Sequence, residues 1–313
     1  MPELTRADYA ALIEARVRAP QELLSALAGR PRRSLVGADG RLMIVAADHT
    51  ARGMLAVGSN PLAVADRYSL LERLSIALAD PGVDGVMASA DILEELAWLG
   101  RLDGRLAIGT INRGGIIGAR WELDDRLTAY DPEHAARFGL DGGKTLLRID
   151  PEDAGTAPTL EMVANVTTRL ADLGLMAMIE PLPYMKDSTG RAVLDTREEA
   201  LIRVVAIASG LAATSSRTWL KIPATANPEL VAAATSMPIL LLGGDPGASW
   251  ELTFQRWETA LRVPNVRGLV PGRPLLYPHE LSVAHAVRRA AALVHGPDTG
   301  PPGDEMSATR EGA

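Results

Sequence analysis

Eight short runs of apolar residues, many of them β-branched, recur along this chain, and each ends in polar or glycine-containing sequence. They are too short for core helices and therefore indicate strands that are buried on both faces. The runs cover residues 42–50, 82–89, 105–115, 145–150, 175–185, 217–225, 238–246 and 266–274.

Helical patterns separate most of these runs, and alternation of strand and helix predicts βαβ units in a parallel sheet. Eight strands within about 230 residues predict an α/β protein with the (β/α)8 TIM-barrel fold. A doubly wound open sheet is the alternative, but its G-x-G-x-x-G turn is replaced after the first run by A-A-D-H-T. The helical patterns cover residues 63–79, 91–100, 159–173, 196–213, 228–234 and 250–262.

Three segments make up the predicted domain organisation. Residues 1–41 form an N-terminal helical extension, with helices expected at 5–18 and 20–29, that caps the barrel or joins an oligomer contact. Residues 42–295 form the catalytic barrel. Residues 296–313 are rich in proline, glycine and charge and are predicted to be disordered. We expect a homo-oligomer.

Composition narrows the class of protein. The formal net charge of -7 argues against nucleic-acid binding, which needs a basic surface. The absence of cysteine excludes disulfides, thiol catalysis and cysteine metal sites. The first residues carry charges at close intervals without an apolar signal segment, and no run approaches the roughly 18 apolar residues of a membrane span. The expected location is the cytoplasm.

Lys221 is the first candidate for chemistry, because it interrupts the apolar run W-L-K-I-P. Lysine is rarely fully buried without a partner. Desolvation lowers the pKa of a buried lysine and supplies the neutral amine that attacks a carbonyl group. A lysine at a frayed strand end, or one that only pairs with a carboxylate, is the structural alternative.

Two carboxylates stand at the ends of other apolar runs, Asp48 in V-A-A-D-H and Glu180 in M-I-E-P. Such groups can move the protons that Schiff-base chemistry requires. A helix cap or a loop hydrogen bond is the structural alternative. A metal site formed with His49 is a third reading, which we rank lower because a divalent cation and an amine nucleophile repel each other.

Lys144 and Arg148 bracket the fourth run, G-K-T-L-L-R-I-D, and their spacing of four places them on one face of a strand. If that face is the barrel interior, both add positive charge near Lys221, which depresses its pKa. An ion pair with Glu180 or Asp48 is compatible with this role, and Lys144 alone could instead face solvent. Arg148 is also a predicted substrate ligand that holds an anionic end of the substrate.

Glycine turns follow the seventh and eighth runs, L-L-G-G-D-P-G and V-P-G-R-P. Loops at these positions of TIM barrels often bind phosphate through backbone N–H groups. The predicted phosphate ligands are Gly243, Gly244, Gly272 and Arg273.

Three further features are less specific. Asn112 and Arg113 follow the third run and either contact substrate or form the turn N-R-G-G. His49 is a candidate substrate ligand beside Asp48. The polar segment 183–195 is either a lid over the site or an ordinary mobile loop.

Taken together, these motifs resemble the class I aldolases of the DhnA, LacD and deoxyribose-phosphate aldolase superfamily. The resemblance rests on A-D-H, G-K-T-L-L-R-I-D, I-E-P, L-K-I-P and the G-G and G-R turns, between about residues 42 and 292. It implies that Lys221 forms a Schiff base, with Asp48, Lys144 and Glu180 as partners and no cofactor or metal. Related aldolases read G-R-N after the eighth strand, whereas Pro274 here lacks a backbone donor.

Within this superfamily the chain looks most like the (β/α)8 aldolase-like proteins of actinobacterial inositol catabolism. That resemblance implies a phosphorylated carbohydrate substrate, with cleavage of 2-deoxy-5-keto-gluconate 6-phosphate to dihydroxyacetone phosphate and malonic semialdehyde. A transaldolase, an acyltransferase or an isomerase on the same barrel is the enzymatic alternative. A barrel that binds a sugar phosphate without catalysis is the alternative from another class.

Overall fold

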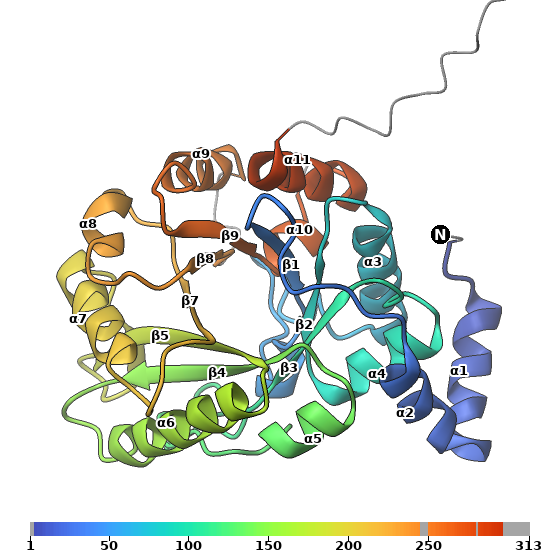
Figure 1. Ribbon diagram of the computed structural model, residues 1–313, viewed down its shortest axis with the longest axis horizontal. Coiled ribbons are helices and arrows are strands. Elements are labelled where there is room, and N and C mark those ends of the chain that lie inside the picture. The colour runs from blue at the N-terminus through green and yellow to red at the C-terminus, as the bar shows by residue number, and fades with distance from the viewer. Residues whose placement is uncertain (1–2, 245–249, 280, 297–313) are drawn as a thin grey trace, which may run out of the picture.

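Eight parallel strands close into a barrel in the computed structural model, which describes residues 3–244, 250–279 and 281–296 (Figure 1). Around the barrel the strands follow the order β4-β3-β2-β1-β9-β8-β7-β5, and the pairing of β4 with β5 closes the ring. The predicted TIM barrel is therefore confirmed, and the open sheet is wrong. The strands are β1 (Leu42–Ala46), β2 (Gly85–Ala88), β3 (Leu106–Thr110), β4 (Gly142–Ile149), β5 (Met176–Lys186), β7 (Thr218–Ile222), β8 (Ile239–Leu242) and β9 (Val266–Val270).

Alternation of side chains along the strands explains why these runs are apolar on both faces. In β1, Leu42 and Ile44 point into the barrel, where they belong to a small core that includes Met178. Met43 and Val45 point outward into the larger core between the sheet and the helices. The strand β1 therefore separates two apolar layers.

Helices surround the barrel and connect successive strands (Figure 1). The helix α3 begins at Arg67, four residues later than the pattern predicts, because the Asp66 side chain accepts a hydrogen bond from the Ser69 N–H and caps the helix. The short helix α5 was not predicted. The connecting helices are α3 (Arg67–Ala79), α4 (Ala90–Trp98), α5 (Pro132–Arg137), α6 (Thr156–Asp172), α7 (Glu198–Ser209), α8 (Pro228–Ala232) and α9 (Trp250–Ala260). Two further helices, α10 (Arg273–Leu276) and α11 (Val283–His295), follow the last described strand, β9.

Two helices precede the barrel, α1 (Arg6–Arg18) and α2 (Pro20–Gly29), and α2 packs against α4. Just after α2, Arg30 forms a buried ion pair of 2.6 Å with Asp141, the residue before β4. This contact attaches the extension at the N-terminal end of the barrel. The predicted disordered tail lies outside the described residues beyond Gly296. No described helix is long and apolar enough to cross a membrane.

Candidate active site

A cavity of about 530 Å³ opens at the carboxyl ends of the strands, where TIM barrels carry their active sites. Its lining brings together most of the residues that the sequence singled out. The polar or charged lining residues are Asp48, His49, Arg52, Arg113, Lys144, Glu180, Tyr184, Lys221 and Arg273, and glycines 243, 244 and 272 also contribute.

Lys221 reaches this cavity from β7. Alternation along the strand turns Lys221 inward, and its neighbours Leu220 and Ile222 pack outward against the helices. The Lys221 side chain is 4% exposed, and its Nζ lies 3.2 Å from Oε2 of Glu180. The amine is thus enclosed beside a carboxylate rather than exposed at a frayed strand end.

Lys144 is the second amine in the cavity. The strand register sets Lys144 beside Thr110, the last residue of β3, so the beginning of β4 is level with the end of β3. Lys144 is 1% exposed and contacts two carboxylates, Glu180 and, at 3.4 Å, Oδ2 of Asp48. A solvent-facing position for Lys144, which the sequence left open, is therefore wrong.

These two lysines are unusual in this chain. The sequence contains only three lysines against 29 arginines. Arginine stays charged in proteins, whereas lysine can lose its proton when it is buried. Two of the three lysines thus line the cavity, where a neutral amine could act on a substrate.

Burial dominates the electrostatics of both amines. It lowers the pKa of Lys221, and the nearby Arg113 charge lowers it further, while Glu180 acts in the opposite direction. Burial also places the pKa of Lys144 well below its usual value. Burial alone would raise the pKa of Glu180, but the positive charges of Lys144 and Lys221 outweigh it, and the Glu180 pKa is lowered.

Arg113 completes the cluster, and the sequence left it as either a substrate contact or part of a turn. Its guanidinium contacts Asp48 and donates a hydrogen bond of 2.8 Å to Oγ1 of Thr110. The only sequence signal was its place directly after an apolar strand. With every group ionised, the cluster has three cations (Arg113, Lys144, Lys221) and two anions (Asp48, Glu180).

His49 lies against Gly272, in the segment that follows β9. Burial and the charge of Arg273 lower the pKa of His49 to about 3, so the ring is neutral at neutral pH. Arg273 donates a hydrogen bond of 3.0 Å to the carbonyl oxygen of Ala56. His49 and Arg273 therefore line the β1 and β9 side of the cavity.

The predicted phosphate ligands Gly243, Gly244, Gly272 and Arg273 share this side of the cavity. Gly244 has a φ of +67°, which favours glycine. Residues 245–249, which complete the sequence motif, lie outside the described residues. Their role in binding phosphate stays a prediction.

Gly272 lies so close to His49 that a substitution there tests whether this part of the cavity binds phosphate. A Cβ atom at Gly272 would lie 2.6 Å from Cε1 of His49 and 2.5 Å from the Ala46 carbonyl oxygen. We expect Gly272→Ala to displace the ring and to weaken binding of dihydroxyacetone phosphate about tenfold, measured by calorimetry. Gly29→Ala is the matched control, since a Cβ there meets nothing within 4 Å. Equal affinity in both variants would contradict the prediction that phosphate binds beside Gly272.

Comparison with known proteins places the chain in a family. The model of the Cgl0159-like family matches residues 40–291. The chain belongs to the Cgl0159-like family. The crystal structure of Cgl0159 from Corynebacterium glutamicum (Brevibacterium flavum) is 47% identical in sequence, with a TM-score of 0.91, over 94% of this chain and 99% of that chain.

Two fructose-bisphosphate aldolases are less similar to this Cgl0159-like protein. An archaeal fructose 1,6-bisphosphate aldolase is 21% identical with a TM-score of 0.62, over 88% of this chain and 99% of that chain. Fructose-bisphosphate aldolase from Slackia heliotrinireducens is 16% identical with a TM-score of 0.61, over 95% of this chain and 93% of that chain. At these identities the likeness shows the barrel fold alone. No curated protein sequence matches the chain.

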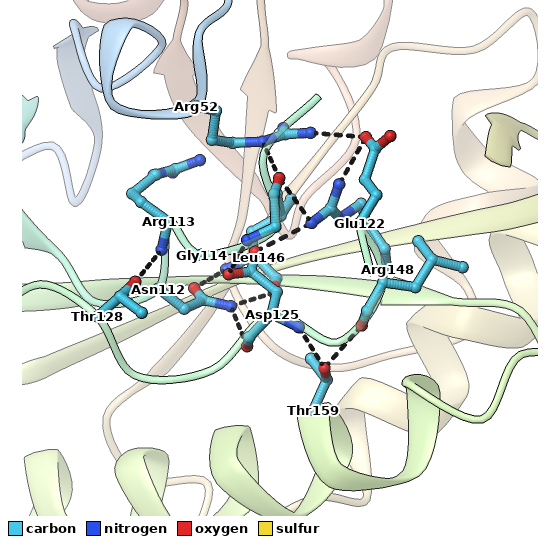
Figure 2. A network of polar contacts seen from close by, with 12 residues as sticks. Arg52, Asn112, Arg113, Gly114, Glu122, Asp125, Thr128, Leu146, Arg148 and Thr159 are labelled. Atoms are coloured by element: carbon cyan, nitrogen blue, oxygen red, sulfur yellow. Dashed lines mark hydrogen bonds and ion pairs between the residues drawn. The ribbon is translucent and has the colours of Figure 1, made fainter. Parts of the chain in front are cut away.

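Two predicted substrate ligands lie elsewhere in this Cgl0159-like protein. Arg148 is not among the residues that line the cavity, because its guanidinium is held by Glu122 at 2.8 Å and Asp125 at 3.1 Å (Figure 2). The Asn112 side chain is fully buried and bonds the backbone of Leu146 and Asp125 (Figure 2). We therefore correct both assignments to structural roles. The spacing that put Arg148 on the same face as Lys144 could not reveal its counter-ions, which come from the 115–125 loop.

The segment 183–195 of the Cgl0159-like protein is a β-hairpin rather than an irregular loop. The strand β5 continues to Lys186 and pairs antiparallel with β6 (Ala192–Leu194). Tyr184 and Leu194, which face each other in this pairing, both line the cavity. The hairpin therefore forms one wall of the candidate site.

The described residues do not form the metal site that the sequence offered as an alternative. Among the described residues, no group of three or more histidine, aspartate and glutamate side chains is placed to hold a metal ion. Asp48, His49 and Glu180 therefore do not form a ligand set. Asp48 and Glu180 contact lysine and arginine side chains instead.

Proposed function

We propose that this protein is a class I, metal-independent aldolase that cleaves a phosphorylated keto-sugar or keto-sugar acid through a Schiff base on Lys221. The observation that carries the proposal is the enclosed contact of 3.2 Å between the Lys221 amine and Glu180, within a cluster that has one cation in excess. Loss of one lysine proton balances this buried charge and leaves the neutral amine that the chemistry needs.

The contacts distinguish the two amines. Lys144 touches both carboxylates, whereas Lys221 touches Glu180 alone. Burial lowers the pKa of both amines, and that of Lys144 more strongly, but an ammonium ion gains more from two carboxylates than from one. On these contacts we assign the proton to Lys144 and the role of nucleophile to Lys221. Lys144 then supplies a positive charge next to the reacting carbon.

In the proposed reaction, the Lys221 Nζ adds to the ketone carbon of the substrate, and the carbinolamine loses water to give an iminium ion. Glu180 and Asp48 take up and return the protons of this step. The iminium accepts the electron pair of the breaking carbon–carbon bond, and a carboxylate removes the proton of the adjacent hydroxyl as the aldehyde leaves. Protonation of the enamine and hydrolysis of the imine then release the second product and regenerate Lys221.

The substrate class rests on the family resemblance and on the cavity. Glycines 243, 244 and 272 with Arg273 are proposed to bind the phosphate, next to His49. The fructose-bisphosphate aldolases that share the fold act on sugar phosphates by name. Within this class, 2-deoxy-5-keto-gluconate 6-phosphate is the proposed substrate, giving dihydroxyacetone phosphate and malonic semialdehyde.

Turnover of candidate substrates tests the proposal. We expect release of dihydroxyacetone phosphate, measured by coupled oxidation of NADH, at a rate that preincubation with EDTA does not change. Loss of activity with EDTA would contradict the metal-independent mechanism. Transfer of the three-carbon unit to an added aldehyde without its release would indicate a transaldolase. Binding of sugar phosphates without any turnover would indicate a barrel that only binds.

A further inference from the structure

Arg113 has a place in the cluster that the proposed mechanism does not yet use. It is 7% exposed, and its guanidinium contacts Asp48 and the hydroxyl of Thr110. The same Oδ2 atom of Asp48 that contacts Arg113 also lies 3.4 Å from Nζ of Lys144. Arg113 and Lys144 therefore compete for one carboxylate oxygen, and Arg113 makes the closer contact.

The backbone holds Arg113 firmly in this position. Its N–H donates a hydrogen bond of 2.8 Å to Oγ1 of Thr128 (Figure 2). The preceding residue, Asn112, is anchored by its side-chain amide to the carbonyl oxygens of Leu146, at 2.7 Å, and Asp125. The loop that carries Arg113 is thus attached to β4 on one side and to its own far end on the other.

A buried ion network underlies this loop. Arg52 and Arg148 both contact Glu122, and Arg148 also contacts Asp125 (Figure 2). The two positive and two negative charges balance, so this network adds little net charge to the cavity. Its effect is to join the segment after β1, the loop after β3 and the strand β4 into one rigid frame for Arg113.

We propose that Arg113 is a positioning residue that occupies Asp48 as its main counter-ion, so that Lys144 keeps only a weaker contact with Asp48 and the two lysines share Glu180 as their close partner. Two amines that share one carboxylate cannot both stay protonated without an uncompensated buried charge. One amine is then neutral at neutral pH. This inference rests on the proposed function for its consequence, which is a Lys221 amine ready to react.

The other groups around the amines do not replace Arg113. His49 is neutral, and Arg52 is paired with Glu122. The pKa of Arg113 is lowered by burial only to about 10, so its charge persists at neutral pH. The titratable and charged groups that face the two amines are Asp48, His49 and Arg52 after β1, Arg113 after β3, Glu180 and Tyr184 on β5, and Arg273 after β9.

The test measures the protonation of each lysine directly. The full-length protein is labelled with trace acetic anhydride across a pH series, and mass spectrometry gives the labelling midpoint of each lysine. In Arg113→Gln, Asp48 becomes available to Lys144, and a positive charge is lost. We therefore expect the midpoint of Lys221 to rise by about one pH unit or more. Lys186, on the hairpin surface, is the internal control and keeps its midpoint in every variant.

Three more variants test these charges: two complete a double-mutant cycle, and the third restores the positive charge at position 113. Asp48→Asn leaves three cations with one carboxylate and is expected to lower the Lys221 midpoint. Arg113→Gln combined with Asp48→Asn removes one charge of each sign and is expected to return the midpoint to within about 0.3 pH unit of the wild type. Arg113→Lys restores the charge and is expected to reverse most of the shift seen in Arg113→Gln. Circular dichroism shows which variants fold.

The outcomes separate this inference from the proposed function. A Lys221 midpoint unchanged in Arg113→Gln, or a double variant that keeps the shifted value, would overturn the role of Arg113. If Arg113→Gln does not fold, the direction of the shift in Asp48→Asn, and its reversal in the double variant, decide the same question. The labelling needs no substrate, so an enzyme that proves not to be an aldolase would leave these results standing.

Discussion

Lys221→Met is expected to lower kcat/KM for the cleaved substrate by about 10⁴-fold or more, with the protein still folded. Methionine fills a similar volume, but it has no amine to form the Schiff base, so the electron sink for bond cleavage is lost. The rate of release of dihydroxyacetone phosphate measures the effect. The melting temperature is expected to stay close to that of the wild type, because the substitution replaces a buried neutral amine with an apolar group of similar volume and keeps the packing.

Lys186→Met is the matched control for this loss. Lys186 lies on the hairpin, its side chain is 37% exposed, and it pairs with Asp153 at 2.6 Å rather than with a cavity residue. We expect this variant to keep nearly full activity. Lys221→Met with more than about one hundredth of the wild-type rate would mean that Lys221 is not the nucleophile.

Asp125→Ala is expected to have the largest effect on stability, a loss of about 3–5 kcal/mol in the free energy of unfolding. Asp125 is 1% exposed, and its carboxylate accepts hydrogen bonds from Arg148 at 3.1 Å and from the Gly115 N–H at 2.9 Å (Figure 2). Its removal leaves the buried Arg148 guanidinium with one carboxylate, Glu122, and the Gly115 carbonyl oxygen. The midpoint of urea unfolding and the melting temperature measure the change.

The neighbouring Asp124 provides the control. Its carboxylate pairs with Arg126 at 2.8 Å, but the Arg126 side chain is largely exposed, and solvent screens such pairs. Asp124→Ala is therefore expected to unfold close to the wild type. If Asp125→Ala were as stable as Asp124→Ala, the buried network would not be the frame that holds the loop.

The architecture was largely predictable because each strand of a TIM barrel carries its own signal. A strand such as β1 must be apolar on both faces, and the helix that follows must present an apolar face to it. The short helix α5 was missed because six residues are too few to show a period, although Asp131 and Pro132 are a recognisable helix start. The hairpin after β5 was missed because its second strand has only three residues.

The candidate site was predictable where a polar residue interrupts or ends an apolar strand. Lys221, Glu180 and Asp48 carry that signal, and the fold brings them together because the carboxyl ends of barrel strands converge. Arg148 carries the same signal but lies in a different environment, since Glu122 and Asp125 come from an irregular loop whose path no periodicity describes. The contact of Arg113 with Asp48 was hidden for the same reason.

The most direct measurement of the central claim is the position of a trapped adduct. Dihydroxyacetone phosphate and sodium borohydride are added to the wild-type protein, which is then digested at arginine. The three lysines fall on separate peptides, residues 138–148 with Lys144, 170–191 with Lys186 and 218–256 with Lys221. We predict that the reduced adduct lies on the peptide 218–256 alone. An adduct on the Lys144 peptide, or no adduct on any peptide, would contradict the account.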